Sequence, residues 1–149
     1  RTVTVRPDVF SAGRVYFCEH GTPELVWRPE WQSHANGTSS MPEFVTVSRS
    51  PAQEAEAFAK LLGGAVANNA VTFDGGALSV LSVDQYRERY GDLASSMGGR
   101  ASIFGALVFK TDNRAQLADL ATDGIRVQGM SGRTLVRVDA FDAVLEFVD

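Results

Sequence analysis

Cysteine is almost absent from this chain of 149 residues, whose only cysteine is Cys18. A single cysteine excludes an internal disulfide and fits a reducing compartment, so we expect a cytoplasmic protein. Cys18 lies in the apolar stretch VYFCEH, which is typical of a small buried side chain. Cys18 and His20 would share one strand face, but no neighbouring residue marks the thiol as an activated nucleophile.

Long apolar runs and clusters of positive charge are also missing. No run approaches the roughly 18 residues of a membrane-spanning helix, and the N-terminus does not have the pattern of a signal peptide. The 14 Lys and Arg residues are scattered among 18 Asp and Glu residues, and the net charge is −4. This distribution excludes a nucleic-acid or anionic membrane partner and leaves a small-molecule ligand.

The sequence also lacks the common catalytic loops. The glycine pairs in LLGGAV and MGGR have neither the spacing nor the lysine of a phosphate-binding loop. No Gly-x-Ser-x-Gly nucleophile elbow occurs, and MSGR at 130–133 is typical of a hairpin turn. The catalytic residues therefore stay unknown at this stage.

The chain does contain a pattern of strand, helix, strand and strand. EFVTVS (43–48) alternates like a strand, and Ser50, Pro51 and Gln53 predict the capped start of a helix that the glycines after Leu62 end. AVTF and ALSVLS, joined by DGG, predict a hairpin. VDQYRERY (83–90) predicts a short helix in the place of a fourth strand.

A second copy of this pattern follows. FGALVFK (104–110) predicts a strand, and a helix capped by Asp112 or Asn113 would carry Leu117, Leu120 and Ala121. IRVQ, RTLVRV and VLEFV predict three further strands. An offset of 62 residues aligns the two copies, pairing Val45 with Leu107 and Phe58 with Leu120.

The repeat predicts an α+β fold. One helix covers only one face of each small sheet, so the other face has to be buried, and the other copy is the obvious partner. Two such units would form a half-open curved sheet with a cleft for a small molecule. A ferredoxin-like double repeat with a flat sheet is the alternative.

The repeat resembles the paired βαβββ modules of the vicinal oxygen chelate (VOC) superfamily, the glyoxalase/bleomycin resistance/dihydroxybiphenyl dioxygenase fold. The stretches YFCEHGTPELVWRPEWQSHANG, PEFVTVSRSPAQEAEAFAKLLGG and AVLEFVD are similar to the C-terminal portion of longer bacterial glyoxalase-like domain proteins. The resemblance implies that residues 1–20 are closing strands of a preceding module and that 21–42 form a linker strap. Residues 43–149 would be a glyoxalase-like domain with modules at 43–100 and 101–149.

Residues 13–37 contain both tryptophans and both histidines of the chain. If these residues belong to a strap, Trp27 and Trp31 would pack over a sheet, and Pro23 and Pro29 would stiffen the path. Contact with a substrate is the alternative interpretation of the same residues.

The resemblance also implies positions for a metal site. Ligands in the superfamily come from the first and last strands of a module, and these positions fall on Glu43 and Glu146, with His20 as a further candidate. The matching position in the second copy falls on Gly105, which has no side chain. Two carboxylates are a small ligand set for Mn, Fe, Ni or Zn, so a chain without metal is the favoured expectation. Glu19 and His34 are the remaining candidates.

Three functions stay open from the sequence. The first is metal-dependent lyase, isomerase or dioxygenase-type chemistry on a small molecule, with the metal as a Lewis acid. The second is a metal-free small-molecule binding module of the resistance type. The third is a degenerate structural half that supports a catalytic half, either as a homodimer or in association with a missing N-terminal half.

Overall fold

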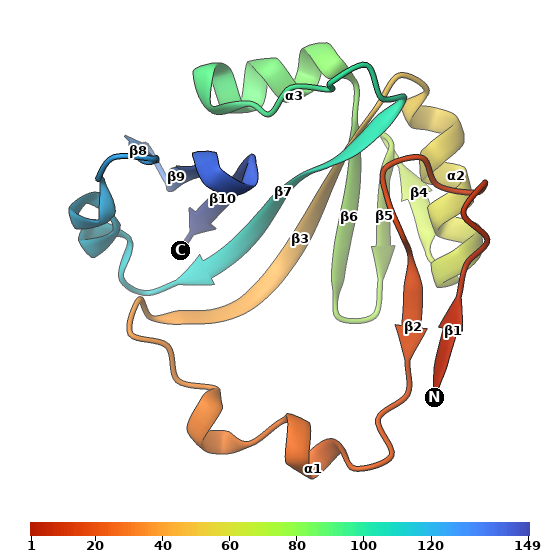
Figure 1. Ribbon diagram of the computed structural model, residues 1–149, viewed down its shortest axis with the longest axis horizontal. Coiled ribbons are helices and arrows are strands. Elements are labelled where there is room, and N and C mark those ends of the chain that lie inside the picture. The colour runs from red at the N-terminus through yellow and green to blue at the C-terminus, as the bar shows by residue number, and fades with distance from the viewer.

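The computed structural model describes all residues, Arg1–Asp149, and its centre is an eight-stranded sheet with the order β4-β5-β6-β3-β7-β10-β9-β8 (Figure 1). The first module contains β3 (Thr38–Ser48), α2 (Pro51–Leu62), β4 (Ala65–Ala67), β5 (Ala70–Phe73) and β6 (Gly76–Leu81). The second contains β7 (Ser102–Thr111), the 3-10 helix η3 (Arg114–Leu120), β8 (Ile125–Met130), β9 (Arg133–Val138) and β10 (Ala143–Val148).

Each module places its first strand beside its last. β3 pairs in parallel with β6, and β7 pairs in parallel with β10. The two first strands, β3 and β7, pair antiparallel and join the modules at the centre of the sheet. The predicted α+β fold of paired βαβββ modules in a curved open sheet is confirmed, and the flat ferredoxin-like alternative is not observed.

Side chains alternate between two faces of this sheet, which we call inner and outer. Val45 and Val108 point to the inner face, where the helix α3 (Val83–Tyr90) packs on them. Phe44 and Leu78 point to the outer face, which α2 covers. In Figure 1, α3 and α2 lie in different places around the sheet, which is consistent with these two separate cores.

The prediction that the first module lacks its fourth strand is wrong. β4 has three residues, all exposed, and gives no alternating signal, so it was missed. The fourth strand is β6, and α3 is an additional element between the modules. The second predicted helix is the 3-10 helix η3, in which Leu117 is buried while Leu120 is 46% exposed.

The expected offset of 62 residues between the modules is also wrong. The Ser48 hydroxyl accepts a hydrogen bond from the Ser50 amide, and Thr111 accepts the same bond from Asn113, so equivalent residues lie 63 apart. Gly105 is skipped in the β3–β7 register, where Val45 pairs with Ala106 and Thr46 with Phe104. A second irregularity lies between Ser40 and Glu43 of β3. An error of one residue in the offset assigns every side chain to the wrong face, so the correction changes which residues are equivalent.

Helix starts differ from the sequence pattern as well. The Ser50 side chain makes no capping hydrogen bond to α2, so the predicted capping box there is absent. A complete capping box instead begins α3, where the Ser82 hydroxyl accepts from the Gln85 amide and the Gln85 side chain accepts from the Ser82 amide. α2 ends, as predicted, at Gly63 in the left-handed conformation, with φ +68°.

The N-terminal residues form a separate two-stranded sheet of β1 (Thr2–Thr4) and β2 (Tyr16–Cys18). The turn between them packs on the outer face, where the rings of Phe10 and Phe58 stack at 4.1 Å. Cys18 is exposed, so the expectation of a buried side chain is wrong. None of the helices is long and apolar enough to cross a membrane.

Candidate functional site

Arg89, near the end of α3, lies between two carboxylates of the sheet. Its Nη1 and Nη2 donate to Oε1 and Oε2 of Glu43 on β3, both at 2.9 Å. Its Nε donates to Oε2 of Glu146 on β10 at 3.0 Å. The planar guanidinium matches Glu43 with two parallel bonds and uses its remaining edge for Glu146.

Two further side chains complete the contacts of Glu146, which is only 3% exposed. Arg133 on β9 donates to Oε1 at 3.2 Å, and the Tyr90 hydroxyl donates to Oε2 at 2.8 Å. Arg89, Arg133, Glu43 and Glu146 together carry two positive and two negative charges. We call these four residues with Tyr90 the arginine–carboxylate cluster, and its formal charge is zero.

The sequence of α3 explains why the cluster forms here. Residues three and four apart share one helix face, so Tyr86, Arg89 and Tyr90 all point toward the sheet. Tyr86 and Tyr90 are each 1% exposed and pack in the inner core with Val45 and Leu135. The helix therefore fills the inner face, which is where the sequence predicted an open cleft.

Gly105 lets α3 approach the sheet closely. A Cβ atom at this position would lie 2.7 Å from Val47 Cγ2 and 3.0 Å from Tyr86 Cε2, which is closer than carbon atoms pack. The Tyr86 hydroxyl donates to the Gly105 carbonyl at 2.8 Å and accepts from the Ser95 amide at 3.1 Å. The missing side chain at Gly105 thus serves packing of the helix.

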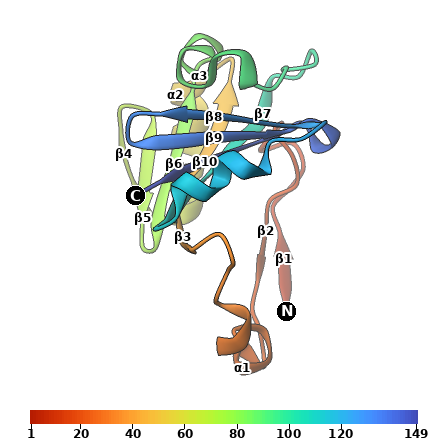
Figure 2. The ribbon, with the colours of Figure 1, turned by 90° about the vertical axis from the view of Figure 1, so that its left-hand side faces the viewer.

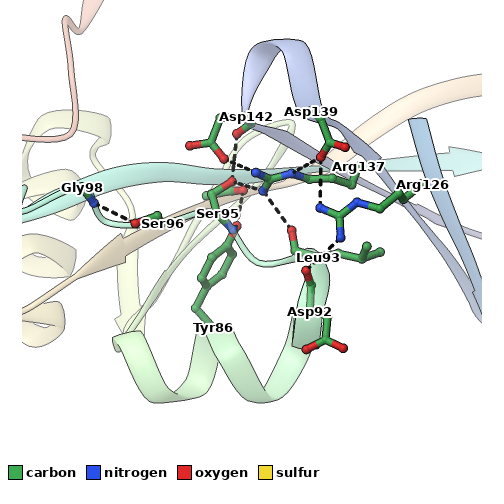
Figure 3. A network of polar contacts seen from close by, with 11 residues as sticks. Tyr86, Asp92, Leu93, Ser95, Ser96, Gly98, Arg126, Arg137, Asp139 and Asp142 are labelled. Carbon is green, nitrogen blue, oxygen red and sulfur yellow. Dashed lines mark hydrogen bonds and ion pairs between the residues drawn. The ribbon is translucent and has the colours of Figure 1, made fainter. Parts of the chain in front are cut away.

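Arg137 on β9 fixes the segment that follows α3 (Figure 3). Its Nη1 donates to the Leu93 carbonyl at 3.0 Å and to the Ser95 hydroxyl at 2.8 Å. Its other nitrogens pair with Asp139 and Asp142 in the turn between β9 and β10. Because Arg133 also donates to the Arg89 carbonyl, two arginines of β9 hold the C-terminal end of α3.

The cluster shifts the pKa values of its members. Partial burial would raise the pKa of Glu43, but hydrogen bonds from Arg89 and Ser79 and the positive charge of Arg89 outweigh burial and lower it. Burial raises the pKa of Tyr90, and the carboxylates of Glu146 and Glu43 raise it further against the opposing positive charge of Arg89. Glu43 is therefore ionised and Tyr90 is a neutral donor throughout the physiological range of pH.

The structure brings together two of the three residues proposed as metal ligands. Glu43 and Glu146 both contact Arg89. His20 follows β2 and is exposed, with its ring in an edge contact 6.4 Å from that of Trp27. His34 lies in the segment before β3 and lines a different pocket.

Sequence reasoning missed Arg89, Arg133 and Tyr90. Their positions depend on where α3 packs on the second module. The pattern of residues along the sequence does not predict this packing. One signal was available: Tyr86, Arg89 and Tyr90 form an aromatic and basic stripe on one face of a capped helix. Such a stripe indicates a buried face that includes one charge, which needs acidic partners.

The donor set does not fit a divalent metal ion. With the observed offset of 63 residues, Ala106 is the counterpart of Glu43, and Ser79, the β6 partner of Val45, is the counterpart of Glu146. The four equivalent positions therefore supply only two carboxylates. All four carboxylate oxygens already accept hydrogen bonds, and no group of three His, Cys, Asp or Glu residues is placed to hold a metal.

Comparisons with known proteins bear on the fold. No family model matches the chain, and no curated protein matches its sequence. Among solved structures, the chain is similar to the methylmalonyl-CoA epimerase from Mycobacterium tuberculosis, with a TM-score of 0.52 and 10% identity over 78% of this chain and 91% of that chain. The chain therefore has a fold of the VOC type, and an identity this low extends no activity to it.

The lowered pKa of Glu43 predicts a loss of stability in acid. A carboxylate whose pKa is lower in the folded state stabilises the protein at pH values above its ordinary pKa of 4.5. This contribution disappears as the pH falls through the lowered pKa. We expect Glu43→Gln to be less stable than the native chain at pH 7 and to approach its stability as the pH falls below 4.5 and through the lowered pKa. Urea unfolding across this range measures the difference.

Glu56→Gln is the matched control, since Glu56 is exposed on α2 and makes no ion pair. Its stability should follow that of the native chain at every pH. A difference between Glu43→Gln and the native chain that stays constant with pH would contradict the prediction.

Proposed function

We propose that this chain is a metal-independent supporting module of the VOC fold, whose inner cleft is closed by its own helix α3. The observation that carries the proposal is the position of Arg89, whose guanidinium contacts both Glu43 and Glu146. A cation of the chain itself thus occupies the space between the two carboxylates that the resemblance assigned to a metal.

Electrostatics supports a metal-free state. A divalent ion between Glu43 and Glu146 would have to displace Arg89 and would still lie close to Arg133. Breaking several charge-assisted hydrogen bonds in a half-buried site costs several kcal/mol, roughly 3–5 for a single uncompensated buried charge. Two carboxylates alone do not offer the three or four ligands that would offset such a cost.

The packing of α3 supports a role for the chain other than catalysis at this cleft. Glu146 is buried, and Tyr86 and Tyr90 fill the inner face above it, so no substrate reaches this carboxylate without displacing α3. α3 follows the first module and is bonded to β9 and β10 of the second, so it holds the modules together. A module whose cleft is closed in this way can support another domain. We propose that it associates with a second copy of the chain or with a catalytic half.

Elemental analysis of freshly purified, tag-free protein tests the proposal. Before and after incubation with Mn²⁺, Fe²⁺, Ni²⁺ or Zn²⁺ and desalting, we expect substoichiometric metal, equal in the native chain and in Glu43→Ala. His20→Ala is the control that identifies adventitious binding at the surface. Near-stoichiometric metal that disappears in Glu43→Ala but persists in His20→Ala would overturn the proposal.

A further inference from the structure

A pocket lies away from the arginine–carboxylate cluster, between the part of the strap that precedes β3, residues 21–37, and the start of β3. Its volume is about 530 Å³. Trp27 and Trp31 line it from the strap, and Met41 and Phe109 line it from the sheet. Pockets for small organic ligands have volumes of roughly 300–1,000 Å³, so the size is suitable for one.

The strap does not pack over the sheet in the predicted way. Trp27 and Trp31 are 63% and 57% exposed, and the short helices α1 (Pro23–Val26) and η1 (Pro29–Trp31) bury no residue. The strap projects from the body of the molecule in both ribbon views (Figures 1 and 2). The only two tryptophans of the chain thus present their rings to a pocket without completing a core.

The charge of the pocket restricts its ligand. No Asp, Glu, Lys or Arg side chain lines it. His34, Thr38 and Ser40 also line it, and none of these side chains has a hydrogen-bond partner within the chain. Arg28 stacks on the Trp31 ring at 4.9 Å, but it is paired with Glu30. An ionised ligand would therefore find no unpaired opposite charge, whereas a hydroxyl or carbonyl group would find three free polar side chains.

We propose that this pocket binds an uncharged, planar aromatic compound that carries a hydroxyl or carbonyl group. Its ring would pack against Trp27 and Trp31 and bury their exposed surface, and its polar group would bond His34 or Ser40. The strap is bonded to the sheet near its end, where Thr111 donates to the Asn36 carbonyl at 2.6 Å, so the pocket has one fixed wall. This site is separate from the closed cleft and does not depend on the proposed supporting role.

The two tryptophans provide the test. Protein labelled with 5-fluorotryptophan should give two ¹⁹F NMR signals, which Trp27→Leu and Trp31→Leu assign. Titration with 2-naphthol should shift both signals with one saturation curve. The affinity should fall at least tenfold for decahydro-2-naphthol, which lacks aromatic rings, and for 2-naphthalenesulfonate, which is charged. Each Trp→Leu variant should bind 2-naphthol about three- to tenfold more weakly.

Phe17→Ala is the matched control, because Phe17 lines a neighbouring apolar pocket of about 410 Å³ that shares Met41. Its affinity for 2-naphthol should equal that of the native chain. The strap buries no residue, so both Leu variants should unfold at the native temperature. The absence of saturable shifts, equal affinity for the saturated analogue, or weaker binding in Phe17→Ala alone would overturn the proposal and leave the closed cleft unaffected.

Discussion

Replacing Arg89 by methionine is expected to lower the free energy of unfolding by about 3 kcal/mol. Methionine keeps much of the packing of the arginine stem but removes five hydrogen-bond donors. Glu146, with a side chain only 4% exposed, would keep Arg133 and Tyr90, whereas Glu43 would lose both of its bonds to the guanidinium. Equilibrium unfolding in urea at pH 7 measures the change.

Arg87→Met is the control for this prediction, since Arg87 lies on the same helix, is exposed and makes no ion pair. It should change stability by less than about 0.5 kcal/mol. If Arg89→Met were no more destabilising than Arg87→Met, Arg89 would have to be a solvated surface residue, and the cleft would not be closed as described.

Tyr86→Ala is expected to be the most destabilising single change, at about 4 kcal/mol. The ring is 1% exposed and lies against Gly105, where little can move to fill the space. Tyr86→Phe should cost about 1–2 kcal/mol, because the Gly105 carbonyl and the Ser95 amide would each lose their partner. Thermal and urea unfolding of both variants separate packing from hydrogen bonding.

Tyr16→Ala provides the matched comparison, since Tyr16 is 52% exposed on β2. Its effect should be small. A cost for Tyr86→Ala close to that of Tyr16→Ala would contradict the placement of α3 on the inner face.

The fold was predictable because its strongest elements carry their own signals. The end of the strand Thr38–Ser48, the helix Pro51–Leu62 and the strand Ala143–Val148 show clear periodicity, and Gly63 ends the helix. β4 was not predictable, because a strand of three exposed residues gains its structure from pairing with β5. The one-residue error in the repeat arose because the register of β3 against β7 is set by pairing between the strands, which the sequence pattern does not contain.

The candidate site was only half predictable. Glu43 and Glu146 lie on strands whose register brings them to the same face, on either side of Val108. Their partner Arg89 comes from a helix, and its approach depends on the space that Gly105 leaves and on the bonds of Arg133 and Arg137 to the end of α3. These are contacts between distant segments, which periodicity does not report.

The strap was misjudged for a different physical reason. Large aromatic side chains are usually buried, and this tendency favoured packing of Trp27 and Trp31 over the sheet. The prolines at 23 and 29 instead begin two short helices that keep the chain away from the sheet. The alternative, contact of the same residues with a substrate, stays a prediction, and the titration of the pocket beside Met41 and Phe109 tests it.

A double-mutant cycle between Arg89 and Glu43 tests the closed cleft most directly. The cycle compares the native chain, Arg89→Met, Glu43→Gln and the double variant by urea unfolding at pH 7. A guanidinium bonded to both oxygens of Glu43 predicts a coupling energy of about 2 kcal/mol, and the parallel cycle with Arg87→Met should give none. Coupling between Arg89 and Glu43 within error of zero would mean that the two groups do not meet, and would leave the carboxylates free for a metal.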